Sequence, residues 1–406
     1  YIMAFTLLPS ALVFLPPPRI AENQNLRKRW RNMLTKGLVW VLRYRIRITI
    51  VTTVLVVLAV LGMQKLRVNT FLIDDLPRSH PLKSAFLFFD QNFGGSRPFE
   101  MAIDVKSDSL GVFDYRVLKE IEKVHNYLEQ TYQATALSSP VSVVKSTNEA
   151  LNGGASQFYS VPDANAFNRL LPHLERFRKR SYFDQMLSED LKQSRFSGRI
   201  PDIGSNLSTE KLLQLNQFVE SSVDTNLVDF RVTGTSLLID KNNDYLVRNM
   251  STGLAIAFAV VALIAGVMFR SWRMILITLL VNVIPLLLVA GIMGALGVTL
   301  KLTTSVIFTI AFGIAVDDTI HFISKLKMEL AKGSSVLYAI KRTYFSTGKA
   351  IIITTFILIS GFMTLLLSAF GGTFYIGLFV SLTLLFALVV DLTLLPVLVL
   401  WFYRPD

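Results

Sequence analysis

The stretch GIAVDDTIHF at residues 313–322 places two adjacent carboxylates and a histidine inside a long apolar block. A block of roughly 20 apolar residues can span the ~30 Å hydrocarbon core of a membrane as a helix. A carboxylate at that depth costs about 2.5–3.5 kcal/mol on insertion scales, and acids found there usually face the interior of a bundle. The stretch therefore predicts a membrane-spanning helix with a polar centre.

The polar side chains of this stretch have a regular helical spacing. Successive residues of an α-helix are about 100° apart, so Gly313, Asp317 and His321 form one stripe. We expect Gly313 to let a neighbouring helix approach closely. A desolvated carboxylate binds a proton more readily, and a second carboxylate beside it strengthens that tendency. We predict that Asp317, Asp318 and His321 form a proton relay; the alternative is a structural, hydrogen-bonded pair of acids.

Other apolar blocks also contain polar side chains at a depth that could bring them to this relay. Measured from the nearest basic residue at 1.5 Å per residue, the depth is ~12 Å for Asp317 and ~13 Å for Asn282. Asp391 lies deeper in its own block, at ~20 Å. The candidate partners of the relay are Asn282, Thr354, Thr355 and Asp391. Interhelical hydrogen bonding without a role in transport stays an alternative for each of them.

The composition indicates a membrane protein. Hydrophobic residues make up 52% of the chain and charged residues 17%, with a mean hydropathy of +0.48. A soluble protein carries about 25% charged residues. We predict a membrane α-helical bundle with one partial transmembrane helix at residues 1–17 and six complete ones. The complete spans are residues 46–63, Met250–Phe269, Met274–Leu296, Leu302–Ile323, Ala350–Phe370 and Phe374–Tyr403.

Basic residues gather beside these blocks, which explains the net charge of +12 without a nucleic-acid partner. Residues 18–45 are strongly basic, an excess typical of cytoplasmic segments. Alternation of the spans then places the basic residues at 270–273 and 325–349 on the same side. We expect residues 325–347 to form an amphipathic helix on the cytoplasmic surface.

The same alternation places residues 67–246 outside the cytoplasm, between a first helix at 46–66 and five helices at 247–406. The mixed composition of this region predicts a folded α+β domain. We expect strands at Phe99–Val105, Val141–Val144, Ser194–Ile200 and Phe230–Val232, with helices at Tyr115–Leu128 and after a cap at Ser208. Two β-α-β units suggest a ferredoxin-like porter domain. Residues 146–192 form an insertion of helices and loops whose role is not assigned.

The residue types exclude several kinds of chemistry. The sequence has no cysteine, so disulfides and thiolate chemistry are absent. Its four histidines lack the spacing of a zinc site. We find no nucleophile–base arrangement and no phosphate loop, and we therefore expect neither an enzyme nor a cofactor, with protons as the coupling ion.

A short repeat suggests that the bundle is duplicated. The sequence TLLP occurs at residues 6–9 and again at 393–396, close to the end of an apolar run each time. Duplicated bundles are common in transporters. Because the chain begins at Tyr1 inside an apolar segment, we expect it to be the carboxy-terminal half of a longer protein. The missing amino-terminal half is expected to hold a matching bundle and outer domain.

The pattern resembles the resistance-nodulation-division superfamily, in particular the exporter-like branch with the mycobacterial large membrane proteins and a sterol-sensing-type bundle. The resemblance covers the whole chain and includes residues 313–318 in the third of the last five spans. Phe93-Gly94-Gly95 before the first outer strand and Thr233-Gly234 before the spans resume also fit. It implies a twelve-span transporter with a ferredoxin-like porter domain in each half. It also implies protonation of Asp317 and Asp318 in the fourth span of this bundle.

Together these features predict an exporter in the bacterial inner membrane, driven by the proton-motive force and acting on lipids or other hydrophobic molecules. Its expected partners are membrane lipids, a hydrophobic substrate, the missing amino-terminal half and further copies of the same chain. Two alternatives remain open at this point. One is a proton-driven accessory of the Sec translocon, and the other is a sterol- or lipid-sensing receptor that transports nothing.

Overall fold

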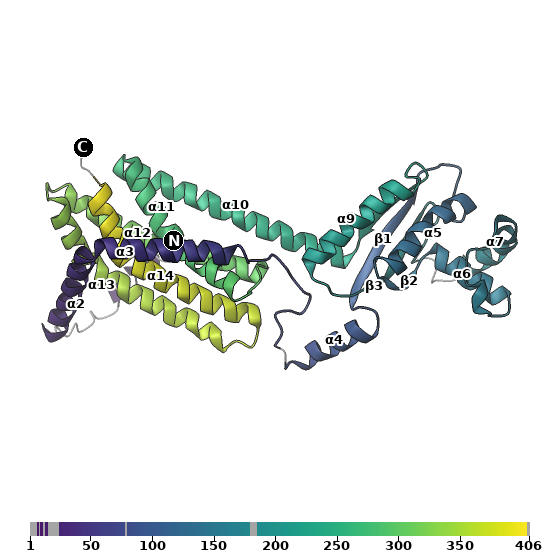
Figure 1. Cartoon of the computed structure of the whole chain (residues 1–406), viewed down its shortest axis with the longest axis horizontal. Coiled ribbons are helices and arrows are strands. Elements are labelled where there is room, and N and C mark those ends of the chain that lie inside the picture. Colours follow the sequence, from purple (N-terminus) through teal and green to yellow (C-terminus); the bar gives the residue numbers. More distant parts are fainter. Residues whose placement is uncertain are drawn as a thin grey trace.

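The computed structural model describes residues 6–7, 9–10, 13–14, 24–77, 79–178 and 185–403 of the 406. Figure 1 shows an elongated molecule with a helical bundle at one end and a smaller α+β domain at the other. The partial span expected at residues 1–17 and the start of the basic segment at 18–45 lie largely outside the described residues.

Within the described residues, six helices are long and apolar enough to cross a membrane. They are α3 (Arg45–Met63), α10 (Thr235–Phe269), α11 (Trp272–Ala295), α12 (Leu302–Leu330), α13 (Val336–Met363) and α14 (Gly371–Phe402). A short 3₁₀ turn, η2 (Thr364–Leu367), extends α13. The six predicted spans are thus confirmed. Several helices continue beyond their apolar blocks, because helical hydrogen bonding does not require apolar side chains.

Helices α11 and α14 form the centre of the bundle. Helix α14 packs against α11, α12 and α13, and α11 packs against α3, α10 and α12. The core around these two helices includes Val281 of α11, Phe322 of α12 and Leu395 of α14, which are almost fully buried.

Small residues allow α3 and α11 to come into backbone contact. A Cβ atom added to Gly291 would overlap the backbone of Ala59, and one added to Gly294 would overlap the carbonyl oxygen of Gly62. Small residues at such crossings are how membrane helices approach closely without a hydrophobic driving force between them.

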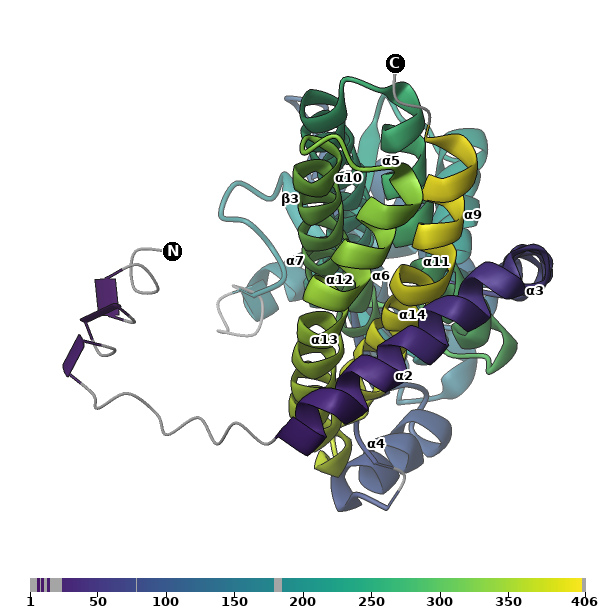
Figure 2. The ribbon, with the colours of Figure 1, turned by 90° about the vertical axis from the view of Figure 1, so that its left-hand side faces the viewer.

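Part of the basic segment forms helix α2 (Gln24–Arg43), which packs against α13 and α14 through Leu34 and Leu38. Figure 2 looks onto this end of the bundle and shows α2 lying across it. The single surface helix predicted at 325–347 was wrong. Residues 325–330 end α12, a turn follows, and residues from Val336 onward begin α13. Several of the apolar residues that suggested a surface helix instead pack inside the bundle, as Leu326 and Tyr344 do, whereas Leu337 is exposed.

The α+β domain contains one four-stranded antiparallel sheet with strand order β2-β3-β1-β4. The strands are β1 (Arg97–Val105), β2 (Thr135–Ser138), β3 (Gln193–Ile200) and β4 (Val228–Thr233). Helix α5 (Tyr115–Gln130) connects β1 to β2, and α9 (Ser205–Ser222) connects β3 to β4. In β1 every second residue is buried, as expected for a sheet with one face on a core.

Three of the four predicted strands are confirmed, but the strand predicted at Val141–Val144 is wrong. These residues lie in helix α6 (Pro140–Leu151), and the second strand is β2 instead. Ser139 caps α6 by accepting a hydrogen bond from the backbone N–H of Ser142. Pro140 occupies the first helical position, where a backbone N–H would have no partner within the helix and its absence costs nothing. These start signals outweigh the local preference of valine for strands.

The remaining elements complete this region. Helix α4 (Pro81–Asn92) follows the first span, and α6 is followed by η1 (Ser156–Phe158) and α7 (Ala164–Arg178). The helix predicted to be capped by Ser208 has its N-cap four residues earlier, at Gly204, where a φ of 81° breaks the preceding backbone.

Helix α10 joins the two parts of the molecule without interruption. It begins at Thr235, after β4 and its N-cap residue Gly234, and its 35 residues correspond to a length of ~52 Å. The side chain of Arg97 on β1 lies 2.8 Å from Asp240 on α10 and 3.5 Å from Asp202, and it is almost fully buried. Asp202 in turn accepts a hydrogen bond from the backbone of Leu72, in the segment after α3. The sheet is therefore fixed to α10 and to the linker from the membrane.

Candidate functional site

Four helices of the bundle place polar side chains in one buried cluster. Thr319 of α12 has its hydroxyl 2.8 Å from Asp391 of α14 and 3.3 Å from the side-chain oxygen of Asn282 of α11. On the neighbouring position of α12, Asp318 lies 3.1 Å from the hydroxyl of Thr355 on α13. These five residues form what we call the buried acid cluster. All except the half-buried Asp318 are 1% exposed or less.

Asp391 is the most enclosed acid of this cluster. Its Oδ1 is the atom close to Thr319, whereas its Oδ2 is buried without a hydrogen-bond partner among the described residues. A buried polar atom without a partner costs about 1–3 kcal/mol, and more if it is charged. The site is therefore poorly suited to an ionised carboxylate.

The predicted stripe of Gly313, Asp317 and His321 faces away from this cluster. The side chains of Asp317 and His321 are 72% and 69% exposed, and they lie 3.5 Å apart. A Cβ atom added to Gly313 would meet nothing within 4 Å. Among the described residues, Asp317 and His321 do not join Asp318, and no helix uses the close approach that Gly313 permits.

The other predicted partners also divide into two groups. Asn282, Thr355 and Asp391 reach the buried acid cluster, although the depth estimate placed Asp391 further from the basic end of its helix than Asp317. Thr354 does not, because it is exposed and its hydroxyl bonds to carbonyl groups of its own helix. Thr319, which sequence reasoning did not single out, stands at the centre of the cluster.

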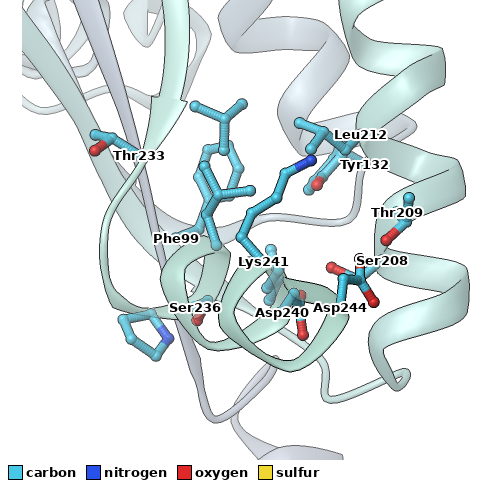
Figure 3. A pocket seen from close by; sticks show the side chains of 14 residues that line it. Phe99, Tyr132, Ser208, Thr209, Leu212, Thr233, Ser236, Asp240, Lys241 and Asp244 are labelled. Carbon is cyan, nitrogen blue, oxygen red and sulfur yellow. The ribbon is translucent and has the colours of Figure 1, made fainter. Parts of the chain in front are cut away.

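A small recess lies where the α+β domain meets α10. Figure 3 shows Ser236, Asp240 and Asp244 of α10 close to Ser208 and Thr209 of α9, with Phe99 and Tyr132 nearby. The recess has a volume of about 30 Å³, the share of one water molecule. It is too small for a lipid. Among the residues that the structure describes, no group of three or more His, Asp or Glu has the arrangement of a metal site.

Comparison with known proteins identifies the family. Residues 117–404 match the MMPL family, a region that takes in most of the α+β domain and the last five spans. A protein of Methanocaldococcus jannaschii, whose name describes it only as a membrane protein, is 25% identical over 334 residues. That alignment covers 80% of this chain and 82% of the relative. With six apolar helices around a buried acid cluster and a family match over most of its length, the chain is a multi-pass membrane protein that belongs to the MMPL family.

Proposed function

We propose that this protein transports hydrophobic or amphiphilic molecules, such as lipids, and that protons bound at the buried acid cluster drive the transport. The family supports a role with hydrophobic substances. It also favours an exporter over an accessory of the Sec translocon or a receptor. We place the protein in the bacterial inner membrane, with the α+β domain outside the cytoplasm as a ferredoxin-like porter domain. The strand order and the two crossover helices support that assignment.

The observation that carries the proposal is a shortage of hydrogen-bond donors around the two acids. The hydroxyl of Thr319 has a single proton but lies within 3.3 Å of three acceptors: Asp391, Asn282 and the carbonyl of Ala315. The hydroxyl of Thr355 likewise lies close to Asp318 and to the carbonyl of Ile351. Neither threonine hydroxyl can donate a hydrogen bond to all of its neighbouring acceptors at once.

One additional proton on each acid removes this shortage. A protonated Asp391 donates to Thr319, which then donates to Asn282, whose own amide already donates to the carbonyl of Thr278 at 2.8 Å. A protonated Asp318 donates to Thr355, which keeps its bond to its own helix. The cluster is therefore built for the neutral acids, and loss of a proton forces it to rearrange.

Such a rearrangement has a direct path to the outer domain. Helix α12, which carries Asp318 and Thr319, packs against α10. The ring centroids of Phe312 on α12 and Phe258 on α10 lie 4.4 Å apart. Helix α10 continues to β4. A proton crossing 100 mV supplies about 2.3 kcal/mol, enough to change the populations of two packing states.

The exposed stripe of Asp317 and His321 supports the expectation of a second bundle. Charged side chains facing lipid are costly, and membrane proteins usually turn them toward other helices or water. We infer that a second bundle covers this stripe and that Gly313 allows its close approach. The second bundle would come from an amino-terminal half or from another copy of the chain.

Infrared difference spectroscopy of the purified protein in lipid nanodiscs tests the central claim. Neutral carboxyl groups and carboxylates absorb separately, so we expect Asp391→Asn to remove a neutral-carboxyl band at pH 7. Asp317→Asn is the matched control and should leave that band in place. A spectrum in which Asp391→Asn removes only a carboxylate band at pH 7 would refute proton binding at the cluster.

A further inference from the structure

Helix α2 lies along one boundary of the membrane-spanning part of the bundle. Figures 1 and 2 show it crossing the direction of α13 and α14 at the end of the bundle away from the α+β domain. Only one residue separates its last residue, Arg43, from the start of α3, which is long and apolar enough to cross the membrane. Near the other end of α2, the ring centroid of Trp30 lies 5.9 Å from the ammonium of Lys349, and the long apolar part of α13 begins at the next residue. Both ends of α2 therefore lie at the same membrane boundary.

The two faces of α2 differ in their exposure. Leu34, Leu38 and Val41 are almost fully buried, and Leu34 and Leu38 belong to the core of the bundle. The opposite face, which we call the basic face, carries four exposed basic side chains, Lys28, Arg29, Lys36 and Arg43. At about 100° per residue these four fall within an arc of about 100°, and the centre of that arc is about 180° from the buried face. The basic face therefore points away from the rest of the protein.

Apolar side chains border the basic face. Trp40 and Met33 lie beside Arg29 around the helix and are 51% and 48% exposed. Tryptophan is enriched at membrane–water interfaces. A helix of this composition lies in the plane of the interface, with its apolar residues toward the acyl chains and its Lys and Arg side chains extended to the head groups. The border of apolar residues therefore favours lipid over water alone as the neighbour of this face.

The basic side chains of this region have no counter-charge nearby in the sequence. Residues 24–47 contain no acid, and the first residues of α3 add two exposed arginines. Among the residues that the structure describes, no member of the basic face forms an ion pair. By contrast, Lys325 and Lys332, near the end of α12, lie 3.5 Å and 2.9 Å from Glu329. The exposed charge of α2 is therefore available to a negatively charged partner.

We propose that the basic face of α2 binds the phosphate groups of anionic phospholipids in the membrane leaflet at this end of the bundle. Lysine and arginine donate charge-assisted hydrogen bonds to phosphate oxygens. Lys28 and Arg43, the outermost members of the face, are separated by ~22 Å along the helix. The face therefore spans several head groups, and its partner is a lipid surface rather than a single bound ion. With the α+β domain outside the cytoplasm, as proposed above, this is the cytoplasmic leaflet.

A fluorescent label in the middle of the basic face measures which lipids surround it. Because the sequence has no cysteine, Asn32→Cys allows a single bimane label at this exposed position. The full chain is placed in phosphatidylcholine nanodiscs that contain a small, equal fraction of nitroxide-labelled phosphatidylglycerol or nitroxide-labelled phosphatidylcholine. We expect the anionic lipid to quench the label about threefold more strongly than the zwitterionic lipid, because each basic residue attracts the anionic surface. Leu367→Cys, 89% exposed at the opposite end of the bundle, is the control and should show nearly equal quenching by the two lipids.

A triple variant and a matched control locate the effect. The α2 variant neutralises three members of the basic face, by Lys28→Gln, Lys36→Gln and Arg43→Gln. It should bring quenching by the two lipids close to equality. The control variant removes two lysines and one arginine from α5 of the α+β domain, by Arg116→Gln, Lys119→Gln and Lys123→Gln. It should leave the preference for the anionic lipid unchanged.

A salt titration tests the same interaction without any substitution in the basic face. Raising the salt concentration should weaken the preference for the anionic lipid, because salt screens exposed charges. The titration remains informative if the α2 variant does not fold. A preference that is independent of salt would contradict binding through these charges.

Equal quenching by the two lipids at position 32, or a preference that the α2 variant leaves unchanged, would overturn the proposal. Excess inorganic phosphate or a short RNA, each at matched ionic strength, should not abolish the preference. Its loss with phosphate would indicate a site for a free anion and its loss with RNA a nucleic-acid surface, and either result would overturn the choice of a lipid surface. The measurement uses no proton gradient and no transported substrate, so this proposal and the infrared test of the acid cluster can each fail while the other stands.

Discussion

Asp317 and Asp318 are neighbours in the chain but lie in opposite environments. Asp317 is exposed beside His321, whereas Asp318 turns toward Thr355 inside the bundle. A rotation of about 100° per residue is enough to separate them in this way. The sequence alone does not reveal which of two adjacent acids is buried, because that depends on how the other helices pack. The small residues Ala311 and Ala315 indicate the buried face of this helix, because they share a face with Thr319 at helical spacing and are buried with it.

Replacing Thr319 by valine tests the centre of the buried acid cluster. The change keeps the side-chain volume but leaves Asp391 and Asn282 without the hydroxyl between them. We expect a loss of about 1–3 kcal/mol in the free energy of unfolding, because buried polar groups lose their partner. Thermal unfolding in detergent measures the effect. Thr354→Val is the control, since Thr354 is exposed and bonds only within its own helix; equal effects of the two variants would contradict a special role for Thr319.

His125 in the α+β domain predicts a pH dependence of stability. Its side chain is fully buried, with Nδ1 3.0 Å from the hydroxyl of Ser139. Burial, with a smaller contribution from the charge of Lys145, lowers the pKa of His125 from 6.5 to about 4. Between these values the unfolded state binds more protons than the folded state, so stability is complete above pH 6.5 and falls as the pH drops toward 4.

The full loss at His125 amounts to about 3 kcal/mol. Hydrogen exchange of α5 in the intact protein, corrected for intrinsic rates, should show reduced protection at pH 5 relative to pH 7.5. His125→Gln should make the protection of α5 nearly independent of pH over this range. Unchanged protection of α5 in the wild-type protein at pH 5 would show that the imidazole is not kept neutral by burial.

The crossing of α3 and α11 depends on glycine at the point of contact. Gly291→Leu would force a side chain into the backbone of Ala59, so we expect α3 to separate from α11 and the bundle to lose several kcal/mol of stability. Limited proteolysis near the end of α3 and thermal unfolding in detergent both report on this. Gly361→Leu on α13 is a matched control because nothing lies within 4 Å of its added Cβ. A fully stable Gly291→Leu variant would contradict the close approach.

The sequence predicted long elements much better than short ones. The six spans could be predicted because the thickness of a membrane requires a minimum length of apolar helix. Strand β2 has only four residues and no clear alternation, so the valines of α6 were mistaken for it. Depth along the helices brought Asn282 and Thr355 to the level of the cluster, whereas it placed Asp391 deeper than the structure does relative to its partners. The separation of Asp317 and His321 from that cluster follows from helix rotation, which depth does not constrain.

Arg97 holds the α+β domain to the rest of the molecule, and its removal should loosen that connection. Arg97→Ala leaves Asp202 and Asp240 buried without their common partner, a change that typically costs 3–5 kcal/mol. Hydrogen exchange should increase in β1 and at the start of α10. Arg231→Ala is the control, because the ion pair of Arg231 with Asp104 lies at the surface, where such a pair contributes about 1 kcal/mol or less. Equal exchange in the two variants would contradict the anchoring role of Arg97.

Because the sequence has no cysteine, a single introduced thiol can show whether a second copy covers the exposed stripe. We expect Asp317→Cys, expressed as the 406-residue chain, to form a disulfide-linked dimer in membranes after mild oxidation. Ile357→Cys, on the exposed side of α13, is the control and should remain monomeric on a non-reducing gel. Equal dimer formation at both positions would indicate random collision. Its absence at position 317 would contradict contact with a second copy at this stripe.

Because α10 is one uninterrupted helix, a change of its tilt within the bundle also moves its other end, next to the sheet. Helix α10 is ~52 Å long, so a tilt of about 5° about its end at Phe269 would displace the end at Thr235 by about 4–5 Å. That displacement is close to the ~4.8 Å spacing of neighbouring β-strands. An angular change small enough to arise from repacking around one buried side chain would thereby shift the α+β domain by about the spacing of two strands.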